Sequence, residues 1–118
     1  MATKHYEGGC QCGAVAYEVD VDIDQAMTCN CSRCQKLGSV MAFAPRDSFK
    51  LKKGEDAVTE YRFNKKQISH LFCKTCGIES FAYGAMPDGS PVAAINVNCL
   101  EGVDPRELKT QHFDGRSV

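Results

Sequence analysis

The sequence predicts a small, mainly β domain held together by bound metal, and three observations support this. The chain has 118 residues, which is the length of one domain. Several short runs alternate apolar with polar residues, as strands with one buried face do. Eight residues are cysteine, far more than an average domain contains. We therefore expect one domain over residues 1–118, with its core at about 5–100 and a C-terminal extension at 101–118.

Six short runs of apolar and β-branched residues predict the strands. The run at 14–21 alternates regularly, and the run at 39–44 ends at Pro45. The run at 68–72 leads into a cysteine pair, and the run at 80–83 follows that pair. Met86-Pro87-Asp88-Gly89 predicts a turn before the last strand. In chain order, the predicted strands cover residues 14–21, 39–44, 58–63, 68–72, 80–83 and 92–97.

Two short segments favour helix, at residues 32–37 and 105–108. Ser32 is the expected capping residue of the first, which would place Cys34 in the opening turn. The positive end of the helix dipole favours a thiolate there. We expect the C-terminal residues 104–105 and 112–115 to form turns with little functional content.

The charge balance and the absence of long apolar runs exclude several kinds of partner. Lys and Arg number 14 against 15 Asp and Glu, a net charge of −1, and no basic block occurs. Binding to nucleic acid or to an anionic membrane is therefore not expected. No apolar run approaches the roughly 18–20 residues of a spanning helix. Residues 1–7 carry charge and lack a signal-peptide core, so we expect a cytoplasmic protein with reduced thiols.

The cysteine spacing favours metal binding over disulfides. Cysteines one or two residues apart are poor disulfide partners for each other, but a tight turn directs both sulfurs toward one ion about 2.3 Å away. Zinc is the first candidate, and iron is an alternative because it also binds tetrahedral thiolate sites. The cysteines form three clusters and one singleton: Cys10 and Cys12; Cys29, Cys31 and Cys34; Cys73 and Cys76; and Cys99.

Seven clustered thiolates divide naturally into four and three. The first and third clusters would together form a closed, structural zinc site that ties distant parts of the chain together. The middle cluster would then supply three ligands and leave a fourth position for water or substrate, as catalytic zinc usually does. The spacing also permits Cys31 and Cys34 to join Cys73 and Cys76 in a two-knuckle ribbon.

The residues around the clusters resemble a known family. The motifs are Gly9-Cys10-Gln11-Cys12-Gly13, Cys29-Asn30-Cys31-Ser32-Arg33-Cys34 and Phe72-Cys73-Lys74-Thr75-Cys76-Gly77. They occur in the order of the glutathione-dependent formaldehyde-activating enzyme family, which shares its domain with centromere protein V. The resemblance implies an Mss4-like fold of small antiparallel sheets clasped by zinc, with one or two short helices. With the division into four and three thiolates, two zinc ions are expected, and the one held by three ligands is expected to be more easily lost.

This resemblance also implies an activity. The enzyme would be a carbon–sulfur lyase that adds glutathione, or a similar small thiol, to formaldehyde or another aldehyde, or catalyses the reverse. Zinc on Cys29, Cys31 and Cys34 would bind the thiol and lower its pKa. Two alternatives stay open: a non-catalytic, zinc-stabilised module that binds proteins, and a redox protein like methionine sulfoxide reductase that uses Cys99.

The remaining candidate residues have simpler expected roles. His70 lies three residues before a cysteine, yet a surface or packing role is favoured over a metal ligand. Arg33 and Lys36 flank the middle cluster and could meet a carboxylate of glutathione, although a solvated basic pair is favoured. Cys99 is expected to be a buried thiol at a strand end, with a role as fourth ligand of the middle cluster as the alternative.

Overall fold

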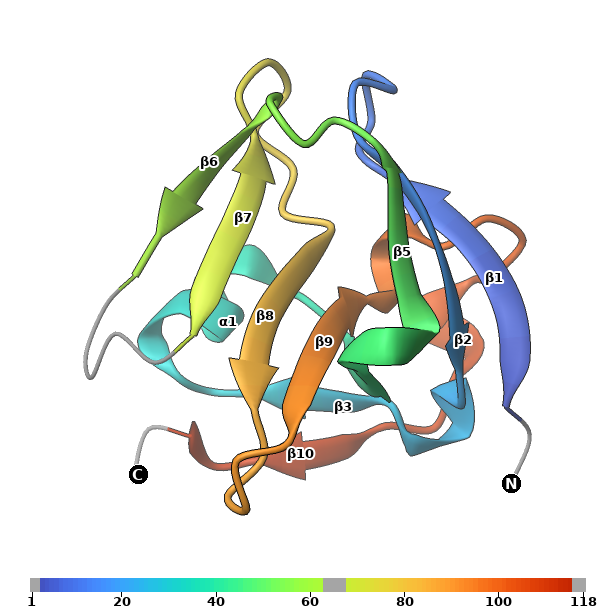
Figure 1. The fold of residues 1–118 in the computed structure, drawn as a ribbon. Coiled ribbons are helices and arrows are strands. Elements are labelled where there is room, and N and C mark those ends of the chain that lie inside the picture. Colours follow the sequence, from blue (N-terminus) through green and yellow to red (C-terminus); the bar gives the residue numbers. More distant parts are fainter. Residues whose placement is uncertain (1–2, 63–67, 116–118) are drawn as a thin grey trace.

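The chain forms two β-sheets that pack against each other (Figure 1). The computed structural model describes residues 3–62 and 68–115, and the elements given below are those of this part of the chain. The smaller sheet is antiparallel and has the strand order β1-β2-β5. Its strands are β1 (Lys4–Gly9), β2 (Ala16–Val21) and β5 (Phe49–Lys53).

The larger sheet has the strand order β10-β3-β4-β9-β8-β7-β6. Its neighbouring strands are antiparallel except β10 and β3, which run parallel. In chain order they are β3 (Met27–Cys29), β4 (Met41–Pro45), β6 (Val58–Tyr61), β7 (Ser69–Cys73), β8 (Phe81–Ala85), β9 (Pro91–Asn96) and β10 (Gln111–Phe113).

Helical structure is limited to short pieces in the described residues. The α-helix α1 (Ser32–Leu37) coincides with the predicted one. The segment predicted at 105–108 forms the 3-10 turn η4 (Pro105–Glu107). Three further 3-10 turns are η1 (Ile23–Gln25), η2 (Arg46–Ser48) and η3 (Val97–Cys99). The predicted class, mainly β with antiparallel sheets and short helices, is confirmed.

The predicted strands correspond to β2, β4, β6, β7, β8 and β9, although Phe63 of the third predicted run lies outside the described residues. Four strands were not predicted: β1 and β5 carry many charged residues, and β3 and β10 have three residues each. The expectation of turns at the C-terminal end is wrong for 112 and 113, because β10 pairs with β3 there.

Aromatic and β-branched side chains fill the space between the two sheets. Tyr17 and Val19 of β2 are almost completely buried, as are Phe81 of β8 and Ile95 of β9. The ring of Tyr17 lies 5.1 Å from that of Phe49 and 5.8 Å from that of Phe81. Such offset and tilted aromatic contacts add to the stabilisation from burial alone. This core holds β7, β8 and β9 in place, and the candidate site is built on the other face of these strands.

Strand register separates the two faces of the larger sheet. Leu71 and Phe81 are paired, and both point toward the core. The next pair along, His70 and Ala82, therefore points to the opposite face, since neighbouring residues of a strand alternate. Helix α1 lies on this opposite face, behind β7 and β8 in the view of Figure 1.

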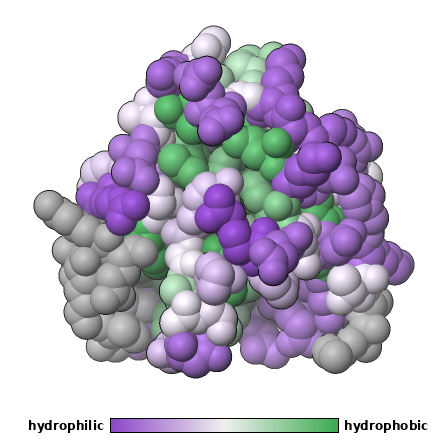
Figure 2. All heavy atoms as spheres, viewed as in Figure 1, coloured by the Kyte–Doolittle hydropathy of each residue, from purple (hydrophilic) through white to green (hydrophobic). Residues whose placement is uncertain are grey.

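A pocket of about 390 Å³ opens between the sheets on the side away from α1. Figure 2 shows the apolar atoms that gather there, between β5 and β7. Its lining includes Phe49, Leu51, Leu71 and Tyr83, and the guanidinium of Arg46 lies 3.4 Å from the centre of the Tyr83 ring.

Within the described part of the chain, no helix has the length and apolar character that a membrane crossing requires.

Candidate metal centres

Four cysteines from the two sheets converge at one end of the molecule. Cys10 and Cys12 lie in the turn between β1 and β2, while Cys73 ends β7 and Cys76 lies in the turn that follows. Their sulfur atoms all lie within 4.8 Å of one another. The Sγ atoms of Cys10 and Cys12 are 3.7 Å apart, and those of Cys12 and Cys73 are 3.6 Å apart. Sulfurs on a tetrahedral zinc are about 3.8 Å apart, whereas a disulfide joins them at about 2.05 Å.

Backbone amides donate hydrogen bonds to two sulfurs of this four-cysteine group and favour their thiolate form. The N–H groups of Thr75 and Cys76 both donate to Sγ of Cys73 at 3.4 Å. These bonds, with that of Cys76 first, lower the pKa of the Cys73 thiol. The N–H of Ile78 acts in the same way on Cys76 and lowers its pKa to about 6. These donors stabilise thiolates, the form that binds zinc.

Cys12 differs from Cys73 and Cys76, because its protonated form is favoured. The N–H of Ala14 favours the thiolate of Cys12, but the hydrogen bond with the Cys73 sulfur, burial and the hydrogen bonds with the other sulfurs outweigh it. The pKa of Cys12 is consequently raised to about 11. A divalent cation bound by these sulfurs would favour the thiolate of Cys12 as well and balance the negative charge of the group.

The remaining three clustered cysteines form a second group around the start of α1. Cys29 ends β3, Cys31 is the N-cap of α1 and Cys34 lies in its first turn. Their sulfurs also lie within 4.8 Å of one another. The cap was expected at Ser32, but the Cys31 sulfur takes this role and accepts from the N–H of Cys34 at 3.3 Å. A sulfur that caps the helix is held in place by the same amides that favour its charge.

The thiolate of this three-cysteine group is favoured at Cys31, not at Cys34 as expected. Burial opposes ionisation of Cys31, but the N–H of Cys34 and further hydrogen bonds outweigh burial and lower its pKa. Burial, and then the hydrogen bond with Cys31 and its charge, raise the pKa of Cys34 to about 12. The helix is six residues long, so its dipole does not overcome these closer effects.

The three-cysteine group has no fourth protein ligand among the described residues. No further His, Cys, Asp or Glu there has a ligand atom within 4.8 Å of all three sulfurs. Cys99 belongs to neither group, and its expected alternative role as the fourth ligand of this cluster is not supported. Burial, and then the charges of Cys10 and Cys76, raise the pKa of Cys99 to about 11, so the nearest charged sulfurs belong to the other group. The donor set suits a tetrahedral metal with one exchangeable position.

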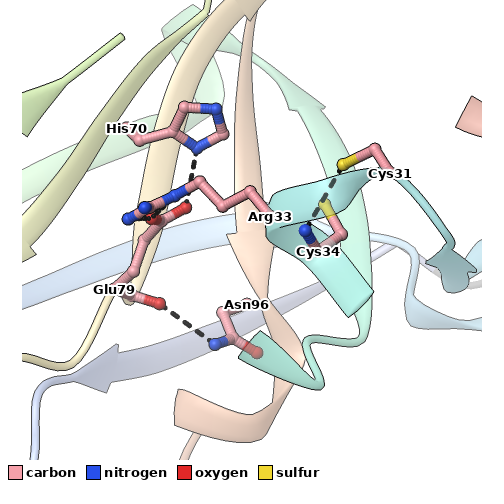
Figure 3. A network of polar contacts seen from close by, with 6 residues as sticks. All are labelled: Cys31, Arg33, Cys34, His70, Glu79 and Asn96. Atoms are coloured by element: carbon pink, nitrogen blue, oxygen red, sulfur yellow. Dashed lines mark hydrogen bonds and ion pairs between the residues drawn. The ribbon is translucent and has the colours of Figure 1, made fainter. Parts of the chain in front are cut away.

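A buried polar network fastens α1 to the larger sheet (Figure 3). Arg33 points from the helix toward Glu79, and its Nε donates to Oε1 at 3.0 Å. His70 of β7 donates from Nδ1 to the other carboxylate oxygen of Glu79, also at 3.0 Å. Asn96 of β9 donates to the backbone carbonyl of Glu79 at 3.0 Å. The Glu79 side chain is 5% exposed and that of His70 is 7% exposed, whereas that of Arg33 is 21% exposed, so the carboxylate at the centre of the network is shielded from water.

This network changes the expected role of Arg33, whereas Lys36 and His70 have the roles that were expected. Arg33 is not part of a solvated basic pair, because its guanidinium is bound by Glu79 and lies 4.8 Å from the centre of the Tyr61 ring. Lys36 is exposed, as expected. His70 packs in the interior and belongs to neither cysteine group. Sequence reasoning missed Glu79. Its position directly before the predicted strand at 80–83 was a signal, because a carboxylate next to a buried strand is often paired with a positive charge.

The fold and the two groups define a class of protein: a small β protein built around cysteine clusters that could hold metal ions. The family model described as "Glutathione-dependent formaldehyde-activating enzyme" matches residues 5–113, and the chain belongs to this family. The chain is also similar to a Rhodobacter sphaeroides protein whose crystal structure was solved by structural genomics. The two share 33% identity over 91% of this chain and 99% of the other, with a TM-score of 0.82.

Proposed function

We propose that the protein is a zinc-thiolate enzyme of the carbon–sulfur lyase type, acting on a small thiol and an aldehyde. The family points to glutathione and formaldehyde as the substrates. The observation that carries the proposal is the three-cysteine group, whose three sulfurs lie within 4.8 Å of one another and would leave the fourth position of a tetrahedral metal for an exchangeable ligand. In the reaction, the thiol sulfur forms a bond with the aldehyde carbon, the carbonyl π bond breaks, and the thiol proton ends on the oxygen as a hydroxyl. The product is an S-hydroxyalkyl thiol, and no oxidant or reductant is consumed.

The chain's own residues favour a thiol over water at this position. When bound there, zinc would lower the pKa of a coordinating thiol so that its thiolate is available near neutral pH. Three thiolates exceed the charge of Zn²⁺ by one, so the site is a weak acid toward water and suits a soft ligand such as sulfur. The N–H of Cys34 holds the Cys31 sulfur in place, and the Arg33–Glu79 pair holds the helix that carries both cysteines.

The four-cysteine group is assigned a structural zinc ion, because all four positions are filled by the protein. Iron remains the alternative metal for either group. All eight cysteines are free thiols, a state that a reducing compartment preserves. This supports a cytoplasmic location, where glutathione is also abundant.

The test measures metal content and adduct formation on the same samples. Zinc per chain is determined before and after addition of excess zinc. The rate at which glutathione and formaldehyde form their adduct is measured by NMR exchange spectroscopy and compared with the rate without protein. We expect two zinc ions per chain and a catalysed rate. Cys31→Ser should remove one zinc ion and the catalysed rate together, whereas Cys99→Ser should change neither. A rate that Cys31→Ser leaves unchanged would contradict the proposal.

A second experiment separates the enzyme from a non-catalytic binding module. With cobalt in the three-cysteine group, binding of glutathione at an exchangeable position changes the ligand-field spectrum. A closed, structural site would give the same spectrum with and without glutathione.

A further inference from the structure

The C-terminal strand places the end of the described chain beside the three-cysteine group. Strand β10 runs parallel to β3, with Gln111 opposite Met27 and Phe113 opposite Cys29. The N–H of Asn30 donates to the carbonyl of Phe113 at 3.3 Å. The backbone pairing therefore continues to Asn30, which lies between Cys29 and Cys31 in the sequence.

Side chains extend this attachment on both sides of Cys29. Thr28 Oγ1 and His112 Nδ1 are 2.9 Å apart and share a hydrogen bond. Asn30 Nδ2 donates to Oδ1 of Asp114, also at 2.9 Å. The residues before and after Cys29 are thus both tied to the segment Gln111–Gly115.

Gly115 follows Asp114 and approaches the Cys29 sulfur closely. A Cβ atom built on Gly115 would lie 2.6 Å from Sγ of Cys29 and 3.4 Å from Cβ of Cys31. Gly115 is not among the glycines with positive φ, so its backbone conformation is open to other residues. The reason for a glycine here is therefore space beside the sulfur.

We propose that the segment Gln111–Gly115 is part of the three-cysteine metal centre and that Gly115 is a positioning residue for the Cys29 sulfur. This inference rests on the proposed binding of metal by this group. A free cysteine can rotate about χ1 and move its sulfur away from an added methyl group at small cost. A sulfur that ligates zinc cannot, because it must stay about 2.3 Å from the ion. A side chain at position 115 therefore opposes metal binding far more than it opposes folding.

The test compares Gly115→Ala with Gly84→Ala. Both variants add the same methyl group, but a Cβ at Gly84 in β8 meets only ordinary contact, 3.6 Å from Ile68 Cγ1. The chain is expected to bind two zinc ions: a tight equivalent at the four-cysteine group and an exchangeable equivalent at the three-cysteine group. The affinity for each equivalent is measured by competition with a chelator. Thermal unfolding is measured on protein that holds only the tight equivalent. We expect Gly115→Ala to weaken the exchangeable equivalent about tenfold or more, since overpacked contacts of this kind are costly. The tight equivalent and the unfolding temperature should stay as in the unchanged protein, and Gly84→Ala should alter none of the three.

A cobalt titration gives a second readout of the same contact. In Gly115→Ala, the sulfur-to-cobalt charge-transfer absorption of the exchangeable equivalent should fall, while that of the tight equivalent is kept. An unchanged affinity and spectrum in Gly115→Ala would overturn the inference alone. A parallel loss of fold stability would also overturn it, because Gly115 would then be structural only. An unchanged protein that binds one zinc ion at every zinc concentration would overturn both this inference and the proposed function.

Discussion

The Tyr17 side chain connects the two sheets through packing and a hydrogen bond. It is 0% exposed, and its hydroxyl donates to the carbonyl of Ser80 at 3.2 Å. Burial raises the pKa of Tyr17 well above its ordinary value of 10, and burial also raises the pKa of Tyr83. The folded state therefore retains protons that the unfolded state releases above pH 10. The stability associated with these groups is fully present below that pH and is lost as the pH rises further.

Tyr17→Phe is expected to lower the free energy of unfolding modestly and to weaken its alkaline pH dependence. The lost hydrogen bond should cost about 1 kcal/mol at neutral pH, because the Ser80 carbonyl still accepts from the N–H of Asn96 at 3.1 Å. Urea unfolding at neutral pH and at several values above pH 10 measures both effects. A variant whose stability declines with rising pH as steeply as that of the unchanged protein would contradict the assignment to Tyr17.

Cys99→Ala tests whether the isolated cysteine contributes to the chemistry. Its raised pKa, about 11, keeps the thiol protonated near neutral pH, and a protonated thiol is a poor nucleophile. We expect the variant to retain its metal content and its catalysed rate, and we expect iodoacetamide to modify Cys99 slowly in metal-loaded protein. Loss of activity with full metal content would instead support the alternative of a sulfoxide reductase-like redox protein.

At the scale of elements, α1 depends on contacts outside itself. A helix of six residues is not stable alone in water. The Cys31 sulfur caps its start, and Gly38 ends it in the left-handed region at a φ of 68°. Between them, Arg33 holds the helix against the sheet through Glu79. The geometry of the three-cysteine group therefore depends on a carboxylate that is not itself a metal ligand.

Glu79→Gln is expected to weaken metal binding at the three-cysteine group. The amide fills the same space and still offers an oxygen to Arg33, but it leaves a partly buried guanidinium without its counter-charge. Loss of a charge-assisted hydrogen bond of this kind costs about 1.5–3 kcal/mol. Zinc competition should show a lower affinity for the exchangeable equivalent only. Lys36→Ala, at an exposed position of the same helix, is the matched control and should bind as the unchanged protein does.

Elements were predictable where local pattern determines them. The alternation in β2 and the cysteine spacing beside α1 both depend on neighbours in sequence, and both predictions agree with the structure. Strands β3 and β10 have three residues each and exist through pairing with each other across more than 80 positions. Glu79 and Gly115 likewise act through partners far along the chain, Arg33 and Cys29. The position of Glu79 before an apolar run indicated a buried charge but not its partner, and nothing local marks Gly115, so the sequence alone could not assign these residues to the site.

At the scale of the whole molecule, the four-cysteine group links the two sheets. Its first pair belongs to the β1–β2 turn of the smaller sheet, and its second pair follows β7 of the larger sheet. Both turns lie at the same end of the molecule, at the top of Figure 1. Spacing alone left a two-knuckle pairing of Cys31 and Cys34 with Cys73 and Cys76 possible, whereas the packing of the sheets brings Cys10 and Cys12 to the latter pair. A metal ion here would close a long loop of the chain, while one in the three-cysteine group would close only a local turn.

Loss of the two metal ions should therefore have unequal effects on stability. Cys12 and Cys73 are 61 positions apart, and the chain-entropy estimate for a cross-link of this span is about 4 kcal/mol, against about 2 kcal/mol for the span from Cys29 to Cys34. We expect Cys73→Ser to lower the thermal unfolding temperature more than Cys34→Ser does. Circular dichroism melts with and without a chelator measure this. The chelator should further destabilise Cys34→Ser, which still holds the structural ion, more than it destabilises Cys73→Ser, which holds only the exchangeable one. Equal losses in the two variants would contradict the division into a structural and an exchangeable site, because each ion would then contribute equally to holding the sheets together.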